Sequence, residues 1–154
     1  MPSLVELLAK EPVRPRVIED CVELIEAQVK QKGFIIKSAY ATIKAIKKRF
    51  IPEVVDTMLD EWLGKLQPHH DKWSANKGSS SFADHVIARG DEVAEDLLSV
   101  TDGRAARTSH TTAKKMYGRM RDGAKKNVIE AIPALARLIE KHVVEQSGKP
   151  AATA

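Results

Sequence analysis

Apolar residues recur every three to four positions along most of this chain, and that spacing constrains the fold more than any other feature. The clearest example lies within residues 53–66, where one helical face would carry Val55, Met58, Leu59, Trp62, Leu63 and Leu66. An α-helix turns once in about 3.6 residues, so side chains at these intervals gather on one side. Few segments show the period of two that is typical of strands. The sequence therefore predicts an all-α protein.

Cap and turn residues divide this pattern into separate helices. We expect helices within residues 3–10, 15–32, 34–50, 51–66, 81–100, 111–121 and 124–144. Ser3 and Glu6 form a capping box at the start of the first, and Ser80 or Ser81 can cap the fifth. Short connections favour antiparallel packing of neighbouring helices. The expected architecture is an irregular antiparallel bundle of six or seven helices.

Prolines and glycines define the expected helix ends. Proline lacks a backbone N–H and clashes with the preceding turn, so we expect Pro68 to end the fourth helix and residues 67–81 to form the longest connection. We expect a turn at residues 101–103 and a break at residues 122–123. Pro133 leaves two possibilities, which are a helix with one hydrogen bond missing and the start of a separate helix.

Residues 34–50 have an apolar face at helical spacing, and the lysines at 37, 44 and 48 share another face. This pattern is typical of a core helix whose lysine side chains extend to water. It is also typical of a basic amphipathic helix that lies on an anionic membrane or fills a partner's groove. We favour the core helix, because a chain of this size needs dense apolar faces for its core.

Length and cysteine content limit the possible number of domains and the possible cellular compartment. The 154 residues suit one domain, which we place at residues 1–145, followed by a disordered tail over residues 146–154. Cys21 is the only cysteine, so it forms no intramolecular disulfide, and its place on an apolar stripe predicts a buried thiol rather than a nucleophile. No secretory signal and no apolar stretch of about 20 residues is visible, so we expect a cytoplasmic protein without stable membrane insertion.

Charge is distributed unevenly along the chain. The net charge is +4 over residues 1–52, −6 over residues 53–100 and +6 over residues 101–154. The basic segment 104–126 offers a candidate polyanion patch, because such arrays bind phosphate backbones through counterion release. Its candidate residues are Lys114, Lys115, Arg119, Arg121, Lys125 and Lys126. We favour a polar face partly paired with the acidic middle, since no helix-turn-helix, zinc finger or aromatic stacking platform is recognisable.

No residue pattern suited to catalysis or metal binding is recognisable. His69, His70 and Asp71 are ligand types that zinc accepts. Adjacent side chains on a helix diverge by about 100°, however, so we expect the two histidines in a solvent-exposed loop and expect no metal site. The chain has no nucleophile-elbow serine, phosphate-binding glycine loop or Glu-x-x-His motif. We therefore predict no catalytic residues and no cofactor.

Three segments resemble a known family. Residues 54–68, 91–102 and 124–142 are similar to those of small bacterial proteins that form a domain family of unknown function. The resemblance covers nearly the whole chain and implies a single domain in a bacterial cytoplasm. It supplies no activity and no functional residue.

Three hypotheses for the function remain. The first is a non-enzymatic interaction module that binds a protein partner or itself, because strong amphipathic helices occur without catalytic motifs. The second is a nucleic-acid-associated protein that uses residues 104–126. The third is an enzyme with a cleft that the sequence does not reveal.

Overall fold

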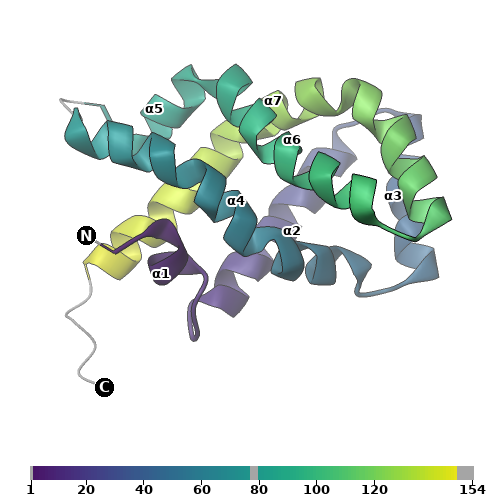
Figure 1. Ribbon diagram of the computed structural model, residues 1–154, viewed down its shortest axis with the longest axis horizontal. Coiled ribbons are helices and arrows are strands. Elements are labelled where there is room, and N and C mark those ends of the chain that lie inside the picture. Colours follow the sequence, from purple (N-terminus) through teal and green to yellow (C-terminus); the bar gives the residue numbers. More distant parts are fainter. Residues whose placement is uncertain (1, 77–79, 149–154) are drawn as a thin grey trace.

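The computed structural model describes residues 2–76 and 80–148, and all regular structure within them is helical (Figure 1). The helices are α1 (Leu4–Leu8), α2 (Arg14–Lys30), α3 (Phe34–Ile46), α4 (Phe50–Ala75), α5 (Phe82–Ala88), α6 (Gly90–Arg107) and α7 (Thr111–Ser147). The all-α prediction is confirmed.

The two longest helices, α4 and α7, organise the bundle. Helix α7 crosses the molecule from the right-hand side of Figure 1 to the lower left and packs against α1, α2, α5 and α6. Helix α4 also packs against α1, α2, α5 and α6. Because both long helices contact the same four shorter ones, the apolar core forms between them.

Serine caps begin two of the helices as predicted. The Ser3 hydroxyl oxygen accepts a hydrogen bond from the Glu6 amide at 3.1 Å, and the Ser81 hydroxyl oxygen accepts one from the Asp84 amide at the same distance. Each bond satisfies an amide that has no partner within its helix. The single helix expected from the second cap is divided at Arg89 into α5 and α6.

Helix α4 continues past Pro68, so the prediction that this proline ends the helix and that residues 67–81 form a long connection is wrong. The missing N–H donor is a local cost. The continued helix places His70 among the rings of Trp73 and Phe82, at centroid distances of 5.4 and 5.0 Å. Aromatic burial against a distant helix outweighs one lost hydrogen bond.

Two further breaks expected from the sequence are absent. The turn predicted at residues 101–103 lies inside α6, and the break predicted at residues 122–123 lies inside α7. The Thr101 hydroxyl donates to the Leu98 carbonyl at 3.0 Å within the helix instead of turning the chain. Pro133 also lies inside α7, so it starts no separate helix. Extended packing of α6 along α7 stabilises both helices through these positions.

The buried side chains are concentrated in one part of the bundle. The largest that are fully buried are Leu4, Leu8, Leu63, Ile132, Val17, Val55, Val86 and Val93. Cys21 is buried as predicted. Among the side chains that the structure describes, none is buried within residues 22–54 or within residues 101–131.

Helix α3 is not a core helix, and that prediction is wrong. It has no buried residue, and Phe34, Ile35 and Ile46 are 84%, 80% and 71% exposed. Only Ile36, Ala39, Tyr40 and Ile43 are half-buried. Helix α3 packs mainly on α2 and α4, and much of its apolar surface remains uncovered.

Helix α7 extends to Ser147, and residues 149–154 of the predicted tail lie outside the described residues. The predicted domain bounds, residues 1–145, stay a prediction. None of the described helices combines the length and apolar character needed to cross a bilayer.

Candidate functional site

An apolar groove lies where α3, α4, α6 and α7 meet, on the right-hand side of Figure 1. Its cavity measures about 480 Å³. We call it the methionine groove, and its apolar wall consists of Ile43, Phe50, Val54, Met58, Met116, Tyr117 and Met120. The α4 residues recur at intervals of four, so they share one helical face. Methionine is unbranched and flexible, and surfaces rich in it adapt to different apolar partners.

A hydrogen-bond network supports the groove wall formed by Tyr117. The Tyr117 hydroxyl donates to the Asp102 carboxylate and lies 3.0 Å from the Thr101 hydroxyl. The Arg121 guanidinium donates to the same carboxylate at 2.8 and 3.2 Å. Hydrogen bonds from Arg121 and then Tyr117 lower the pKa of Asp102. Burial, followed by the bond to Asp102, raises the pKa of Tyr117.

The structure divides the predicted polyanion patch into paired and unpaired residues. Arg121 pairs with Asp102, and Lys125 lies 3.2 Å from Asp91 and 3.1 Å from Glu95. The other four residues of the patch form no ion pair within the described part of the chain and are exposed: Lys114, Lys115, Arg119 and Lys126. Carboxylates of α6 thus neutralise two of the six candidates, and only those that pair with Lys125 belong to the acidic middle, residues 53–100.

Further basic groups surround the methionine groove. Arg104, Arg107 and Lys114 line it, and Arg104 pairs with Glu61. Arg107 is exposed and forms no ion pair with another described residue. On α3, Lys37 is likewise exposed and unpaired among the described side chains. The groove therefore has a positively charged rim.

The histidines expected in an exposed loop are buried in α4, and that prediction is wrong. His69 and His70 are 3% and 6% exposed. His69 Nε2 lies 2.7 Å from Asp96 Oδ2 of α6, and burial lowers the pKa of His70. A signal for this burial was present, because Trp62, Leu66, His69 and Trp73 continue the helical spacing of α4. The helix end predicted at Pro68 excluded both histidines from that helix, so their burial was not predicted.

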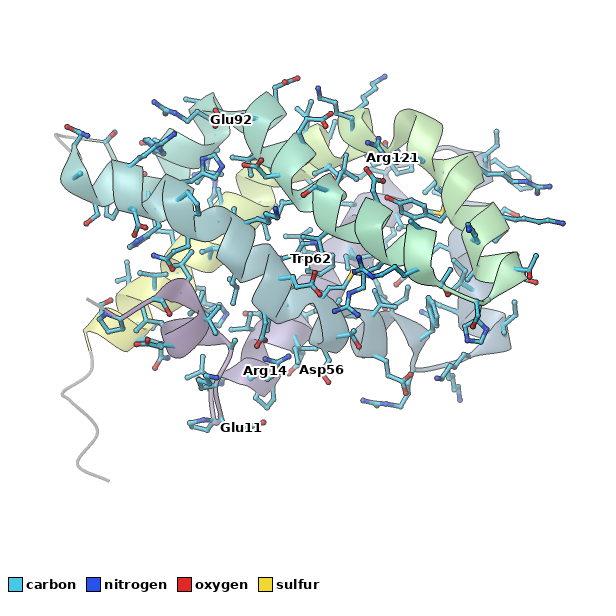
Figure 2. The ribbon with its side chains drawn as sticks, in the orientation of Figure 1. Glu11, Arg14, Asp56, Trp62, Glu92 and Arg121 are labelled. Atoms are coloured by element: carbon cyan, nitrogen blue, oxygen red, sulfur yellow. The ribbon has the colours of Figure 1, made fainter. Side chains whose placement is uncertain are left out.

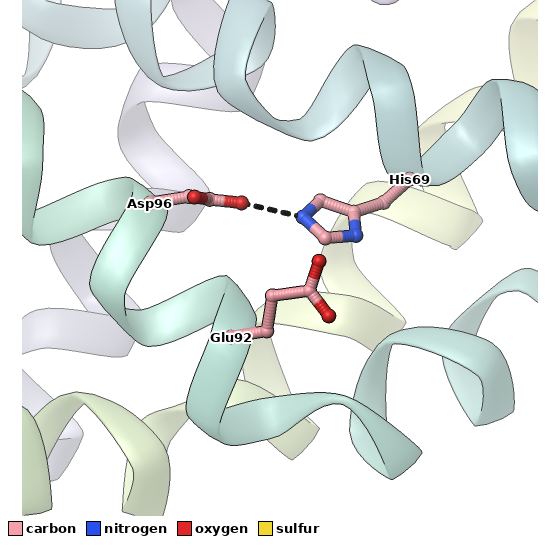
Figure 3. A group of neighbouring side chains, drawn as sticks. All are labelled: His69, Glu92 and Asp96. Atoms are coloured by element: carbon pink, nitrogen blue, oxygen red, sulfur yellow. Dashed lines mark hydrogen bonds and ion pairs between the residues drawn. The ribbon is translucent and has the colours of Figure 1, made fainter.

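His69 belongs to a cluster that has metal-ligand chemistry (Figure 3). One ligand atom each of His69, Glu92 and Asp96 lies within 4.8 Å of the other two. Figure 2 shows Glu92 at the upper side of the molecule, away from Arg121. None of the three residues lines the methionine groove. An imidazole nitrogen and two carboxylates are donors that zinc and related ions accept.

A second cavity, of about 230 Å³, lies between α2, α4, α6 and α7 and is lined almost entirely by carbon and sulfur atoms. Trp62, Leu63, Leu98 and Val128 contribute to it, and Figure 2 places Trp62 near the centre of the molecule. Cys21 also lines it, and burial, followed by the charge of Asp20, raises the pKa of its thiol to about 12. A thiol that remains protonated is a poor nucleophile, which agrees with the structural role predicted for Cys21.

Comparison with known protein families gives a match. No curated protein and no solved structure matches the chain. Residues 4–143 match the model of a family described as a family of unknown function, DUF6918. The match covers most of the chain and confirms the resemblance to a family of unknown function. The chain belongs to the DUF6918 family.

Proposed function

We propose that this protein is a non-enzymatic interaction module, and that its methionine groove binds an acidic amphipathic helix of a partner protein. The observation that carries the proposal is the apolar surface at α3, α4 and α7. Phe34, Ile35 and Ile46 are exposed on α3, the helix that also contributes Ile43 to the groove.

The apolar character of this region favours a protein partner. Contiguous exposed apolar surface on a protein commonly marks a site of interaction. A groove lined by methionine and aromatic side chains accepts the apolar face of a helix, whose anchors recur at intervals of three and four residues. Covering this surface would give α3 the burial that its packing on α2 and α4 does not provide.

Charge around the groove selects the polar face of the partner. Arg107 and Lys114 line the groove, and Lys115 and Arg119 are neighbours one turn apart on α7. None of these four residues is paired with a described carboxylate. Acidic residues at the edge of the partner helix would complement this rim, raising the association rate and selecting against basic partners.

Nucleic acid is the second candidate, supported by exposed and unpaired Lys114, Lys115, Arg119 and Lys126. Phosphates would complement these charges. A phosphate backbone offers no apolar surface to the groove side chains Met58, Met116 and Met120, however, whereas an amphipathic helix has both an apolar and a charged face. The protein partner therefore accounts for more of the exposed surface.

The proposal assigns no catalytic role to the groove and places the protein in a bacterial cytoplasm. Two titratable groups in its wall are engaged in structure, because Tyr117 binds Asp102 and Arg104 binds Glu61. Cys21 is buried with a raised pKa. These observations support binding rather than bond chemistry.

Fluorescence anisotropy with two labelled helical peptides tests the proposal. Both have an apolar leucine face, and the polar face is glutamate in one and lysine in the other. We expect the acidic peptide to bind more tightly. Ile35→Ser with Ile46→Ser, and separately Lys114→Glu with Lys115→Glu, should weaken its binding about fivefold or more.

Matched controls lie elsewhere on the surface. Val144 is 63% exposed near the end of α7, and Arg137 is exposed on the same helix. Val144→Ser and Arg137→Glu should leave affinity unchanged. Equal binding of the two peptides, or equal loss in the controls, overturns the proposal. Tighter binding of duplex DNA, with a steep salt dependence, would support the nucleic-acid hypothesis instead. Concentration-dependent dimerisation that Ile35→Ser with Ile46→Ser abolishes would identify a second copy as the occupant.

A further inference from the structure

We propose that His69, Glu92 and Asp96 form a binding site for a divalent transition-metal ion of the zinc class, which would join α4 to α6. This site is distinct from the methionine groove and is independent of the proposed function. It rests on the position, burial and charge of three side chains (Figure 3).

The positions of the donors suit a single ion. Glu92 and Asp96 are four residues apart on α6, so both carboxylates point from one face of that helix toward His69 on α4. The three ligand atoms lie within 4.8 Å of one another. Donors bound tetrahedrally to one zinc ion at about 2.1 Å lie about 3.4 Å apart, so a shift of about 1 Å or less by each of two donors completes the coordination.

Burial makes His69 a preorganised ligand. Its side chain is 3% exposed, and Nε2 lies 2.7 Å from Asp96 Oδ2. Buried imidazoles lose little rotamer freedom on binding an ion, because packing has already fixed the ring. The second ring nitrogen of His69, Nδ1, is also buried and has no hydrogen-bond partner among the described residues.

The net charge of the three side chains favours the binding of a cation. Asp96 forms an ion pair with His69 alone, and Glu92 forms none, within the part of the chain that the structure describes. Two carboxylates around one imidazole leave net negative charge whether the His69 ring is neutral or protonated. A divalent ion would replace the proton that His69 and Asp96 share and would neutralise Glu92 as well.

A second buried histidine provides an internal control. His142 Nε2 lies 2.7 Å from Asp20 Oδ2, and Glu145 lies 3.9 Å from Nδ1, so the residue types match those of the first cluster. Lys141 lies 3.6 Å from the Asp20 carboxylate and supplies positive charge there. Among the described residues, the ligand atoms of this second group do not converge as those of His69 do. We expect it to bind no ion.

The donor set defines the class of ion. One imidazole and two carboxylates suit zinc, cobalt and manganese better than ions that prefer thiolates. Three protein donors leave at least one position for water or for an additional ligand. The exposure of Glu92 gives the ion access from solvent.

Isothermal titration of the untagged, chelator-treated protein with zinc tests the site, and the visible absorption of bound cobalt provides a second readout. We expect one ion per chain, and a higher unfolding temperature when zinc is present. Glu92→Gln should weaken zinc binding at least about tenfold, because it removes a charged donor. Glu92 is exposed, so this variant retains the core.

Glu145→Gln is the matched control, since Glu145 is also an exposed helical glutamate beside a buried histidine. It should bind zinc as the unmodified chain does. The proposal is overturned if zinc does not bind at millimolar concentration, if Glu92→Gln binds as tightly as the unmodified chain, or if Glu145→Gln weakens binding equally. A cobalt spectrum that Glu92→Gln leaves unchanged would place the ion elsewhere and overturn it too.

Discussion

The two ends of the bundle have the same helical spacing of apolar residues but bury those residues to different extents. At one end, on the left of Figure 1, α1 and α5 cover the second half of α4 and the second half of α7. At the other end lie α3, the start of α4, the end of α6 and the start of α7, and no described side chain within residues 22–54 or 101–131 is buried. We call these the packed end and the open end.

The difference shows that an apolar stripe needs a partner before it stabilises a fold. Val86 on α5 and Ile132 on α7 are buried because α5 lies directly on α7. Ile35 and Ile46 on α3 belong to an equally regular helix but lack such a neighbour. Stability is therefore concentrated at the packed end, and the open end retains exposed apolar surface.

The largest expected effect comes from one substitution made at both ends. Ile132→Ala should lower the free energy of unfolding by about 2–5 kcal/mol, because Ile132 is 1% exposed and its removal leaves a cavity. Ile35→Ala should change it by less than about 0.5 kcal/mol. Urea unfolding monitored by circular dichroism measures both values. Similar losses in the two variants would mean that α3 is packed in solution and would break the comparison.

A second test concerns polar groups at the two ends. Asp20→Ala removes the partner of His142, whose side chain is 3% exposed, and should cost about 1–3 kcal/mol by leaving a buried nitrogen without its hydrogen bond. Glu26→Ala removes an exposed partner 3.6 Å from Lys44 on α3 and should cost less than about 1 kcal/mol. The same denaturation experiment compares them. If Glu26→Ala lowers the free energy of unfolding more than Asp20→Ala does, the Glu26–Lys44 ion pair contributes more to stability than the exposure of its side chains indicates.

The parts of the fold that the sequence predicts correctly are those decided by nearby residues. Helical spacing identifies the apolar faces, and the caps at Ser3 and Ser81 depend on amides only three residues away. The continuation of α4 past Pro68 depends instead on Phe82, which belongs to another helix. The sequence shows that Pro68 disfavours a helix. It does not show that His70 packs against Phe82 of another helix, which outweighs that cost.

The candidate sites were harder to predict for the same reason. Spacing shows that α3 has an apolar face, but it does not show whether another helix covers that face. His69 and Asp96 are separated by 27 positions and meet only because α4 packs on α6. The pairing of Arg121 and Lys125 with α6 also depends on tertiary packing, although the charge pattern indicated that some pairing would occur.

The smallest expected effect concerns pH at the open end. The fold lowers the pKa of Asp102, so the unfolded chain binds more protons than the folded chain just below the ordinary carboxyl pKa of about 4. The stability from this carboxylate is fully present above that pH and is lost as pH falls through the lowered pKa. Its side chain is 40% exposed, which limits the contribution to about 1 kcal/mol or less.

Asp102→Asn should remove this contribution while leaving the shape of the side chain nearly unchanged. The difference in unfolding free energy between the unmodified chain and Asp102→Asn should therefore be present at pH 7 and shrink as the pH falls toward 2. Asp84→Asn serves as the control, because Asp84 is exposed and forms no ion pair within the described chain. A difference for Asp102→Asn that stays constant with pH would show that the network with Tyr117 and Arg121 is not formed in solution, and that the open end is looser than its hydrogen bonds indicate.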